Sequence, residues 1–278
     1  MQNNEKPNPS QSSRNENYQE DDKILGGNSV AIRGEIIENT PTVPHVEVTF
    51  LTNAAPNLLF STKSDDSQAG KKTFVSGADW FDTKLKPILN AIRDDDPFAD
   101  QLLYDIEQSI YNLGGIYKQE LSELKFALET KLSNFNASLH LNDNMHLATY
   151  KIVFQNRLAY DLLWALKELD TVLYYLYFCD KYAVLPAREI AEKRTTLRKQ
   201  YRQTLQMINR WKSTSITRDD VAHNTQRVTK TFEINSEIKL TKEVLLLEVR
   251  ADCAPNIRTR RGNNLDKITH SKIVELYC

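Results

Sequence analysis

The sequence predicts a mainly α protein of the α+β class, in which three long helices form a bundle beside a small N-terminal β component. Apolar residues recur at steps of three or four over residues 98–132, the period of one face of an α-helix. Residues 158–182 are apolar nearly all round, which is typical of a helix in the middle of a bundle. Residues 45–52 alternate apolar and polar side chains and form the strongest strand pattern in the chain.

Composition divides the chain of 278 residues into three segments. Residues 1–42 are rich in Asn, Ser, Gln, Pro and Glu, and they have too few apolar groups to offset the entropy of folding. They are predicted to be a disordered leader. Residues 43–252 carry the apolar periodicity and are predicted to form a single mainly helical domain. Residues 253–278 are polar and basic, so they are predicted to be a flexible tail.

The totals limit the class of protein. Lys and Arg number 36 against 37 Asp and Glu, so a nucleic-acid binder of this composition needs a local basic face. The 3 cysteines lack Cys-x-x-Cys spacing, which argues against a disulfide framework and a zinc site. The most hydrophobic segment, residues 158–179, is interrupted by charged residues and is predicted not to span a membrane. Met1 is followed by a polar stretch, so a cytoplasmic location is predicted.

The first long helix is predicted over residues 97–133. Asp96 is its predicted N-cap, because a side-chain oxygen there can accept hydrogen bonds from free N–H groups of the first turn. Pro97 suits the first helical position, where its missing N–H costs nothing. The apolar stripe keeps its phase across Gly114 and Gly115, so one continuous helix is predicted despite the helix-destabilising glycines.

The remaining elements follow from similar local patterns. Alternation predicts a second strand over residues 147–154, and the other two long helices are predicted at 156–183 and 187–212, separated at Pro186. Residues 217–220 read Thr-Arg-Asp-Asp, which predicts a capping box at the start of a short helix.

No pattern in the sequence predicts an enzyme. Most carboxylates lie at predicted helix starts, where capping explains them, and the 5 histidines show no metal-ligand spacing. A glycine-rich phosphate loop and a Gly-x-Ser-x-Gly motif are both lacking from the sequence. We therefore expect neither a catalytic residue, nor a cofactor, nor a metal.

The third long helix is strongly basic. Between residues 188 and 212 it carries eight Lys and Arg residues against two Glu. Arg194, Arg198 and Arg202 follow one another at intervals of four, so they are expected on one face of the helix. Such a stripe can contact DNA phosphates. The alternative is a solvated basic face that pairs with acidic side chains of neighbouring helices.

Two other groups are candidates for DNA contact. Arg258, Arg260 and Arg261 lie in the predicted tail, where they can act as a phosphate-contacting arm or as a solubilising end. The second group is the outward polar face of the first strand, formed by His45, Glu47 and Thr49. Paired with a second strand, this face can enter a major groove. The alternative is a strand that only covers the bundle.

The order of several short motifs points to a family. They are the strand at 45–52, Val75-Ser76-Gly77, Asp94-Asp95-Asp96-Pro97-Phe98-Ala99-Asp100, the helix at 162–173 with Asp170, Ile216-Thr217-Arg218-Asp219-Asp220, and Ala254-Pro255-Asn256-Ile257-Arg258. Together they resemble the AcaB-like family of proteins encoded on integrating conjugative elements and conjugative plasmids. The resemblance covers about residues 43–258.

The resemblance implies a bacterial, cytoplasmic regulator of transfer genes, in a family whose named member is a transcriptional activator related to ribbon-helix-helix DNA binders. In that class, strands from two subunits pair into a ribbon, so it implies a homodimer on promoter DNA, read through His45, Glu47 and Thr49. A basic helix follows the strand in the family, whereas residues 54–59 contain no arginine. The alternative function is a helical interaction protein that serves the transfer or maintenance machinery of a mobile element through a protein partner.

Overall fold

The computed structural model describes residues 44–66, 71–139 and 148–276, so the predicted leader at 1–42 lies outside the described part. The strands are β1 (Val46–Phe50), β2 (Thr62–Asp66), β3 (Lys71–Val75) and β4 (Ala148–Ile152). The α-helices are α1 (Ala54–Leu59), α2 (Ala78–Arg93), α3 (Pro97–Asn134), α4 (Arg157–Lys181), α5 (Ala187–Gln206), α6 (Arg218–Ala222), α7 (Gln226–Ile234), α8 (Lys242–Leu245) and α9 (Lys267–Leu276). Two short 3-10 helices are η2 (Met207–Arg210) and η3 (Arg261–Asn263). The predicted mainly α fold with a small β part is confirmed.

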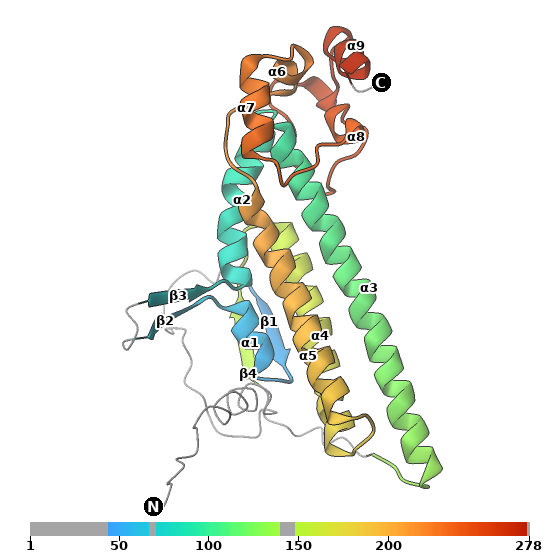
Figure 1. Ribbon diagram of the computed structural model, residues 1–278. Helices are drawn as coiled ribbons and strands as arrows, with labels where there is room; N and C mark the ends of the chain where they lie inside the picture. Colours follow the sequence, from blue (N-terminus) through green and yellow to red (C-terminus); the bar gives the residue numbers. More distant parts are fainter. Residues whose placement is uncertain (1–43, 67–70, 140–147, 277–278) are drawn as a thin grey trace, which may run out of the picture.

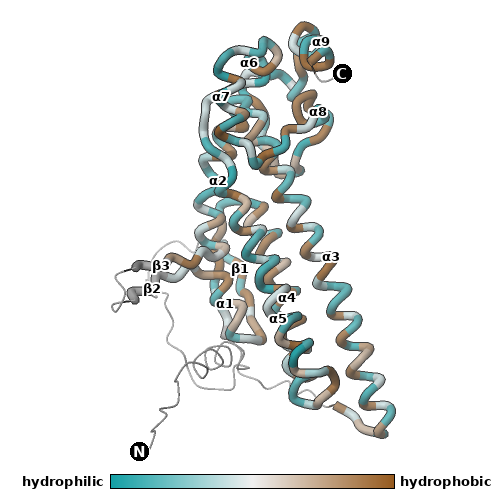
Figure 2. The backbone as a smooth tube through the Cα atoms, in the orientation of Figure 1, coloured by the Kyte–Doolittle hydropathy of each residue, from teal (hydrophilic) through white to brown (hydrophobic). Residues whose placement is uncertain are grey.

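Helices α3, α4 and α5 run along the long axis of the molecule (Figure 1) and correspond to the three predicted long helices. Helix α4 packs against α1, α2, α3 and α5, and its buried residues are spread around most of its circumference. Its predicted place in the middle of the bundle is therefore confirmed. Figure 2 shows hydrophobic and hydrophilic residues recurring along α3 and α5, as in helices with one buried side. Among the described residues, no helix is both long and apolar enough to cross a membrane.

Helix α3 begins at the predicted cap. The Asp96 carboxylate accepts hydrogen bonds from the backbone N–H groups of Phe98 at 2.9 Å and Ala99 at 3.1 Å. The helix continues for 38 residues through the glycine pair at 114–115. At 1.5 Å per residue it is about 57 Å long, so it reaches from one end of the bundle to the other.

Helix α5 is shorter than the predicted 187–212. Its α-helical part ends at Gln206, and η2 completes one tighter turn before the chain becomes extended at Trp211. The extended stretch has partners elsewhere, because the indole N–H of Trp211 donates to Asp96 at 3.2 Å and the backbone N–H of Lys212 donates to Asn235 at 2.8 Å. These contacts direct the chain from α5 towards the C-terminal helices.

Strands β1 and β4 pair antiparallel within the chain, and this pair is called the ribbon below. Val46 lies opposite Ile152 and Val48 lies opposite Tyr150, so the alternating apolar positions of both strands share one face. The resemblance implied that β1 pairs with the strand of a second subunit. The structure corrects that expectation, because β4 of the same chain carries the matching alternation and pairs with β1.

Asp170 of α4 holds the end of β1 against the bundle. Its buried carboxylate accepts hydrogen bonds from the backbone N–H groups of Leu51 at 2.7 Å and Thr52 at 2.9 Å, and from the Thr52 hydroxyl at 2.8 Å. The ammonium of Lys167 lies 3.2 Å away and balances its charge. The apolar face of the ribbon is thereby fixed towards the core, and the polar face is left outside.

The C-terminal helices α6, α7, α8 and α9 gather around the start of α3 (Figure 1). The predicted capping box is present: the Asp220 N–H donates to the Thr217 hydroxyl at 3.3 Å, and the Thr217 N–H donates to the Asp220 carboxylate at 3.0 Å. Helix α9 packs against α6 and α8, and its Ile273 is fully buried. Residues 253–276 therefore join the folded body, which differs from the flexible tail that their polarity predicts.

Candidate nucleic-acid interface

An open hollow of about 1030 Å³ lies along α5 and is bordered by α3 and η2. Its apolar lining consists of Leu113, Ile116 and Met207. Its basic side chains are Arg198, Lys199, Arg202 and Arg210, and its acidic side chain is Glu237. With four cations against one carboxylate, this basic hollow is a positively charged surface in a chain whose formal net charge is -1.

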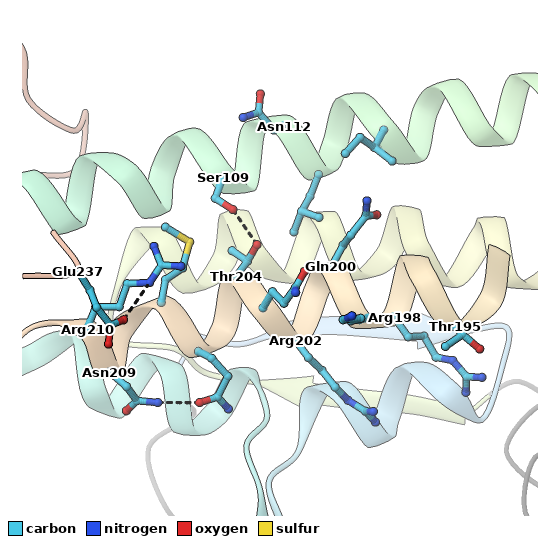
Figure 3. A pocket seen from close by; sticks show the side chains of 16 residues that line it. Ser109, Asn112, Thr195, Arg198, Gln200, Arg202, Thr204, Asn209, Arg210 and Glu237 are labelled. Carbon is cyan, nitrogen blue, oxygen red and sulfur yellow. Dashed lines mark hydrogen bonds and ion pairs between the residues drawn. The ribbon is translucent and has the colours of Figure 1, made fainter. Parts of the chain in front are cut away.

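Two side-chain contacts, one of them part-buried at the hollow and one fully buried, hold α5 in place. The hydroxyls of Ser109 on α3 and Thr204 on α5 lie 2.7 Å apart, a pair that Figure 3 marks with a dashed line. Deeper in the bundle, the Tyr117 hydroxyl donates to the backbone carbonyl of Leu197 at 3.3 Å. The basic side chains are therefore presented by a helix whose position is fixed on its apolar side.

The cations of the hollow differ in their surroundings. Figure 3 shows Arg198 and Arg202 pointing away from α3, and both Lys199 and Arg202 are exposed. The guanidinium of Arg210 lies 3.8 Å from Glu237, in a pair that is itself largely open to solvent. Among the described residues, no acidic side chain lies within ion-pair distance of Lys199 or Arg202. These two cations are the most accessible to an anionic ligand.

The predicted stripe of three arginines is split by the fold. Arg194 lies outside the hollow, and its guanidinium is 3.6 Å from the carboxylate of Asp180 at the end of α4. The side chain of Arg198 turns back along the helix and donates from Nε to the Arg194 carbonyl at 3.3 Å. Arg194 therefore fits the alternative interpretation, in which the basic face pairs with acidic side chains of neighbouring helices. Arg202, in contrast, lines the hollow.

The outward face of the ribbon carries the three predicted strand residues. The imidazole of His45 lies 3.3 Å from the Glu47 carboxylate, which also lies 3.7 Å from the ammonium of Lys151. Thr49 pairs across the ribbon with Thr149, hydroxyl to hydroxyl, at 2.9 Å. This face is polar and close to neutral. None of the three predicted residues lines the basic hollow.

The three C-terminal arginines have different environments. Arg258 is 63% exposed, and its guanidinium lies 2.7 Å from Asp94. Arg261 is exposed in η3. Arg260 is only 6% exposed and donates to Asp95 at 2.7 Å and to Asp219 at 2.8 Å. The guanidinium of Arg260 is therefore taken up by the buried Asp95 and the more exposed Asp219 within the fold, whereas Arg258 and Arg261 lie at the surface.

Arg260 belongs to an ionic cluster at the start of α3 whose members are buried or largely buried except for the more exposed Asp219, and which is called the acid–arginine junction below. Its members are Asp95, Asp100, Asp219, Arg218, Arg250 and Arg260. At its centre, the fully buried guanidinium of Arg218 lies 2.8 Å from Asp95 and 2.7 Å from Asp100. It also donates to the carbonyls of Val244 and Leu245, at 2.9 and 3.1 Å. The junction ties the C-terminal helices to the bundle.

The junction unites two of the motifs that carried the family resemblance. Asp95 comes from the acidic run before α3, and Arg218 comes from the Thr-Arg-Asp-Asp segment at the start of α6. Asp95 has a φ of 71°, a left-handed conformation that aspartate tolerates better than most residues. From the sequence, the only role predicted for the residues of both motifs was helix capping. The signal that this prediction missed was a lone arginine among acids in one motif and a run of acids in the other.

Burial and hydrogen bonding shift two pKa values beside the junction in opposite directions. Burial raises the pKa of Asp96 from 3.8 to about 6, although hydrogen bonds from Ala99 and Trp211 oppose the shift. Burial also acts to raise the pKa of Asp219, but hydrogen bonds from Arg260 and Thr269 outweigh it and lower that pKa below its usual value. Both shifts follow from packing and pairing within the fold.

Side chains that could support chemistry are few in the described part. Among those residues, no group of three or more His, Cys, Asp or Glu side chains could hold a metal ion. Burial raises the pKa of the Cys179 thiol, and burial with the nearby Glu107 carboxylate raises that of Cys253 to about 12. Thiols with such pKa values stay protonated near neutral pH, so both are poor nucleophiles.

One family model, described as the transcriptional regulator AcaB, matches residues 40–258. The chain belongs to this family. The resemblance drawn from short motifs is thereby confirmed, and it places the chain among regulators of transcription. The AcaB match includes the ribbon, the basic hollow and Arg218, but it ends before Arg260. No curated protein and no solved structure matches the chain.

Proposed function

We propose that this chain is a DNA-binding regulator of conjugative transfer genes and that the basic hollow of α5 contacts the phosphate backbone. The observation that carries the proposal is the excess of four cations over one carboxylate on a single open surface, in a member of a family of transcriptional regulators. Lys199 and Arg202 are the principal phosphate contacts in this proposal, and Arg198 and Arg210 are secondary contacts.

The physical reason is that phosphate contacts supply most of the affinity of proteins for DNA, through release of bound counterions. Side chains on a helix fixed by the bundle lose little further freedom on binding, so they bind at a smaller entropic cost. Phosphate contacts carry no sequence information directly. In the proposal, bases are read instead by the outward face of the ribbon, with His45, Thr49 and Lys151 as donors and acceptors.

The genetic element, the target promoters, the location and the partners of the protein also belong to the proposal. Location on a mobile element, action on its promoters and a cytoplasmic location are what the resemblance implies, and the lack of enzymatic activity is a prediction from the sequence motifs. A homodimer and a protein partner in the transfer apparatus remain predictions. Because the ribbon is complete within one chain, a dimer is not needed to form it and would instead serve to bind two half-sites.

The test compares two pairs of lysine and arginine substitutions in the full chain. One variant is Lys199→Gln/Arg202→Gln, and the matched control is Lys84→Gln/Lys86→Gln, which removes two exposed cations from α2 outside the hollow. Binding to promoter fragments of its own element and to unrelated DNA is measured by fluorescence anisotropy at several salt concentrations.

The hollow variant is expected to lose affinity about tenfold at low salt and to flatten the slope of log K against log salt by about 2, close to 0.9 per lost contact. The control is expected to match the wild type. Equal slopes for all three proteins would remove the hollow from the interface. No binding by the wild type at micromolar protein and low salt would show that the proposed function is wrong.

A further inference from the structure

We propose that the acidic part of this chain's own N-terminal segment, residues 16–25, occupies the basic hollow when DNA is absent and competes with DNA for it. The inference rests on the proposed function, because it describes how that same site is regulated. Three features of the segment support the inference: its charge, its apolar end, and the length of chain that connects it to β1.

The charge of the segment is opposite to that of the hollow. Residues 16–22 contain four acidic residues, Glu16, Glu20, Asp21 and Asp22, and no basic one. Residues 1–43, which precede the described part of the chain, contain seven acidic and four basic side chains in total, so the negative charge is concentrated in residues 16–22. The hollow presents four cations against Glu237. Opposite charges of this density attract at short range and are weakened by salt.

The apolar part of the hollow is matched as well. Beside its cations the hollow exposes apolar surface, including Ile116, whose side chain is 37% exposed on α3. DNA phosphates gain nothing from such a surface. In the segment, the acids are followed after Lys23 by Ile24 and Leu25, two large apolar residues. A peptide with acids beside a pair of aliphatic side chains therefore fits both kinds of lining, since burying aliphatic side chains against an apolar surface is favourable.

The connecting chain is long enough for this contact. Between Asp22 and Val46, where β1 begins, lie 23 residues, which can span about 80 Å when extended. The whole of α5, with 20 residues, is about 30 Å long. A tethered segment of this kind reaches effective concentrations in the millimolar range, so even a weak contact fills the site. DNA must then displace the segment before it can bind.

The experiment uses the full chain and two triple variants that remove the same charge from the N-terminal segment. Glu20→Gln/Asp21→Asn/Asp22→Asn neutralises the acidic run, and Glu5→Gln/Glu35→Gln/Glu38→Gln is the matched control outside it. The first measurement needs no DNA: the rate at which an acylating reagent modifies Lys199 is followed by mass spectrometry, relative to the exposed Lys86 on α2.

Docking predicts that Lys199 reacts several times more slowly in the wild type and in the control than in the acidic-run variant. Equal Lys199 rates in all three proteins would overturn the docking. Protection that disappears on dilution would overturn docking within one chain, because it would show that the segment comes from a second copy. The footprint is independent of DNA, so it decides the docking even if the proposed function fails.

The second measurement is DNA affinity. The acidic-run variant is expected to bind DNA about fivefold more tightly than the control triple, a value at the low end of typical coupling between sites. That gain is expected to vanish in the Lys199→Gln/Arg202→Gln background. If the acidic-run variant and the control triple bind DNA with equal affinity, the segment does not compete with DNA for the hollow. DNA binding itself would remain intact in that case.

Discussion

The basic hollow and the acid–arginine junction are both rich in arginine, yet they use it in opposite ways. In the junction, Arg218 is fully buried and its donors are taken by two carboxylates and two backbone carbonyls. In the hollow, Arg202 is exposed beside other cations. A buried guanidinium is tolerated only when it is paired and hydrogen-bonded, because its desolvation is costly. A repelling group of exposed cations is stable only in water or beside an anion.

The difference shows why charge read from a sequence is a poor measure of charge available to a ligand. Arg258, Arg260 and Arg261 form one basic group in the sequence, but Arg260 is buried in the junction while the other two are exposed. Likewise, Arg194 and Arg202 share a predicted stripe, but only Arg202 lines the hollow. Availability depends on which acids the fold brings near each arginine.

The largest expected effect comes from removing the central cation of the junction. Arg218→Met leaves Asp95 and Asp100 buried without their main partner, and we expect the free energy of unfolding to fall by about 3–5 kcal/mol. Arg202→Met in the hollow serves as the matched control and is expected to change it by less than about 0.5 kcal/mol. Urea unfolding followed by circular dichroism measures both.

A second variant separates the loss of the pair from the loss of volume. In Arg218→Met combined with Asp95→Asn and Asp100→Asn, no unpaired buried charge remains from these three residues, so part of the lost stability is expected to return. If Arg218→Met and Arg202→Met lower the free energy of unfolding by the same amount, the arginine of the junction does not contribute more to stability than the arginine of the hollow.

A smaller effect concerns Asp96, which caps α3 beside the junction. Its pKa is raised to about 6 in the fold, so between pH 4 and 6 the native state binds more protons than the unfolded state. The free energy of unfolding attributable to this group therefore falls as the pH rises through that range, by on the order of 2–3 kcal/mol.

Substitution by asparagine isolates this dependence. Asp96→Asn keeps a capping side chain but does not titrate, and it loses the acceptor for the Trp211 indole at every pH. The difference in stability, wild type minus variant, is therefore expected to decrease between pH 4 and 6 and to stay constant above about pH 7. Parallel stability curves over the whole range would contradict the raised pKa.

Patterns that are local in sequence predicted most of the fold. The Asp96 cap, the capping box at Thr217 and the long helices depend on neighbouring residues, and the structure confirms them. What the sequence could not provide were contacts between distant residues. Arg218 and Asp95 are 123 positions apart, and Arg260 and Asp95 are 165 apart. Periodicity shows that a side chain lies on a given face of a helix, but not which element covers that face.

The β part illustrates the same limit. Both strands of the ribbon were predicted from alternation, whereas their pairing was not, because several registers and partners satisfy one alternating pattern. The hollow was predicted in part, through the basic character of α5. Its other wall, on α3, could not be predicted, because Ser109 and Ile116 have no charge or motif that marks them in the sequence.

The smallest expected effect comes from Arg258, and it tests whether the DNA interface includes this residue near the acid–arginine junction. Arg258 is exposed and pairs with the equally exposed Asp94, so Arg258→Gln is expected to lower the free energy of unfolding by less than about 1 kcal/mol. Its backbone N–H still donates to the Arg93 carbonyl at 2.9 Å, because that bond does not depend on the side chain. Under the proposed function, its DNA affinity and salt slope stay at wild-type values. A slope flattened by about 1 would instead assign Arg258 to the phosphate contacts, and the interface would then extend from the hollow to the end of the molecule that holds the junction.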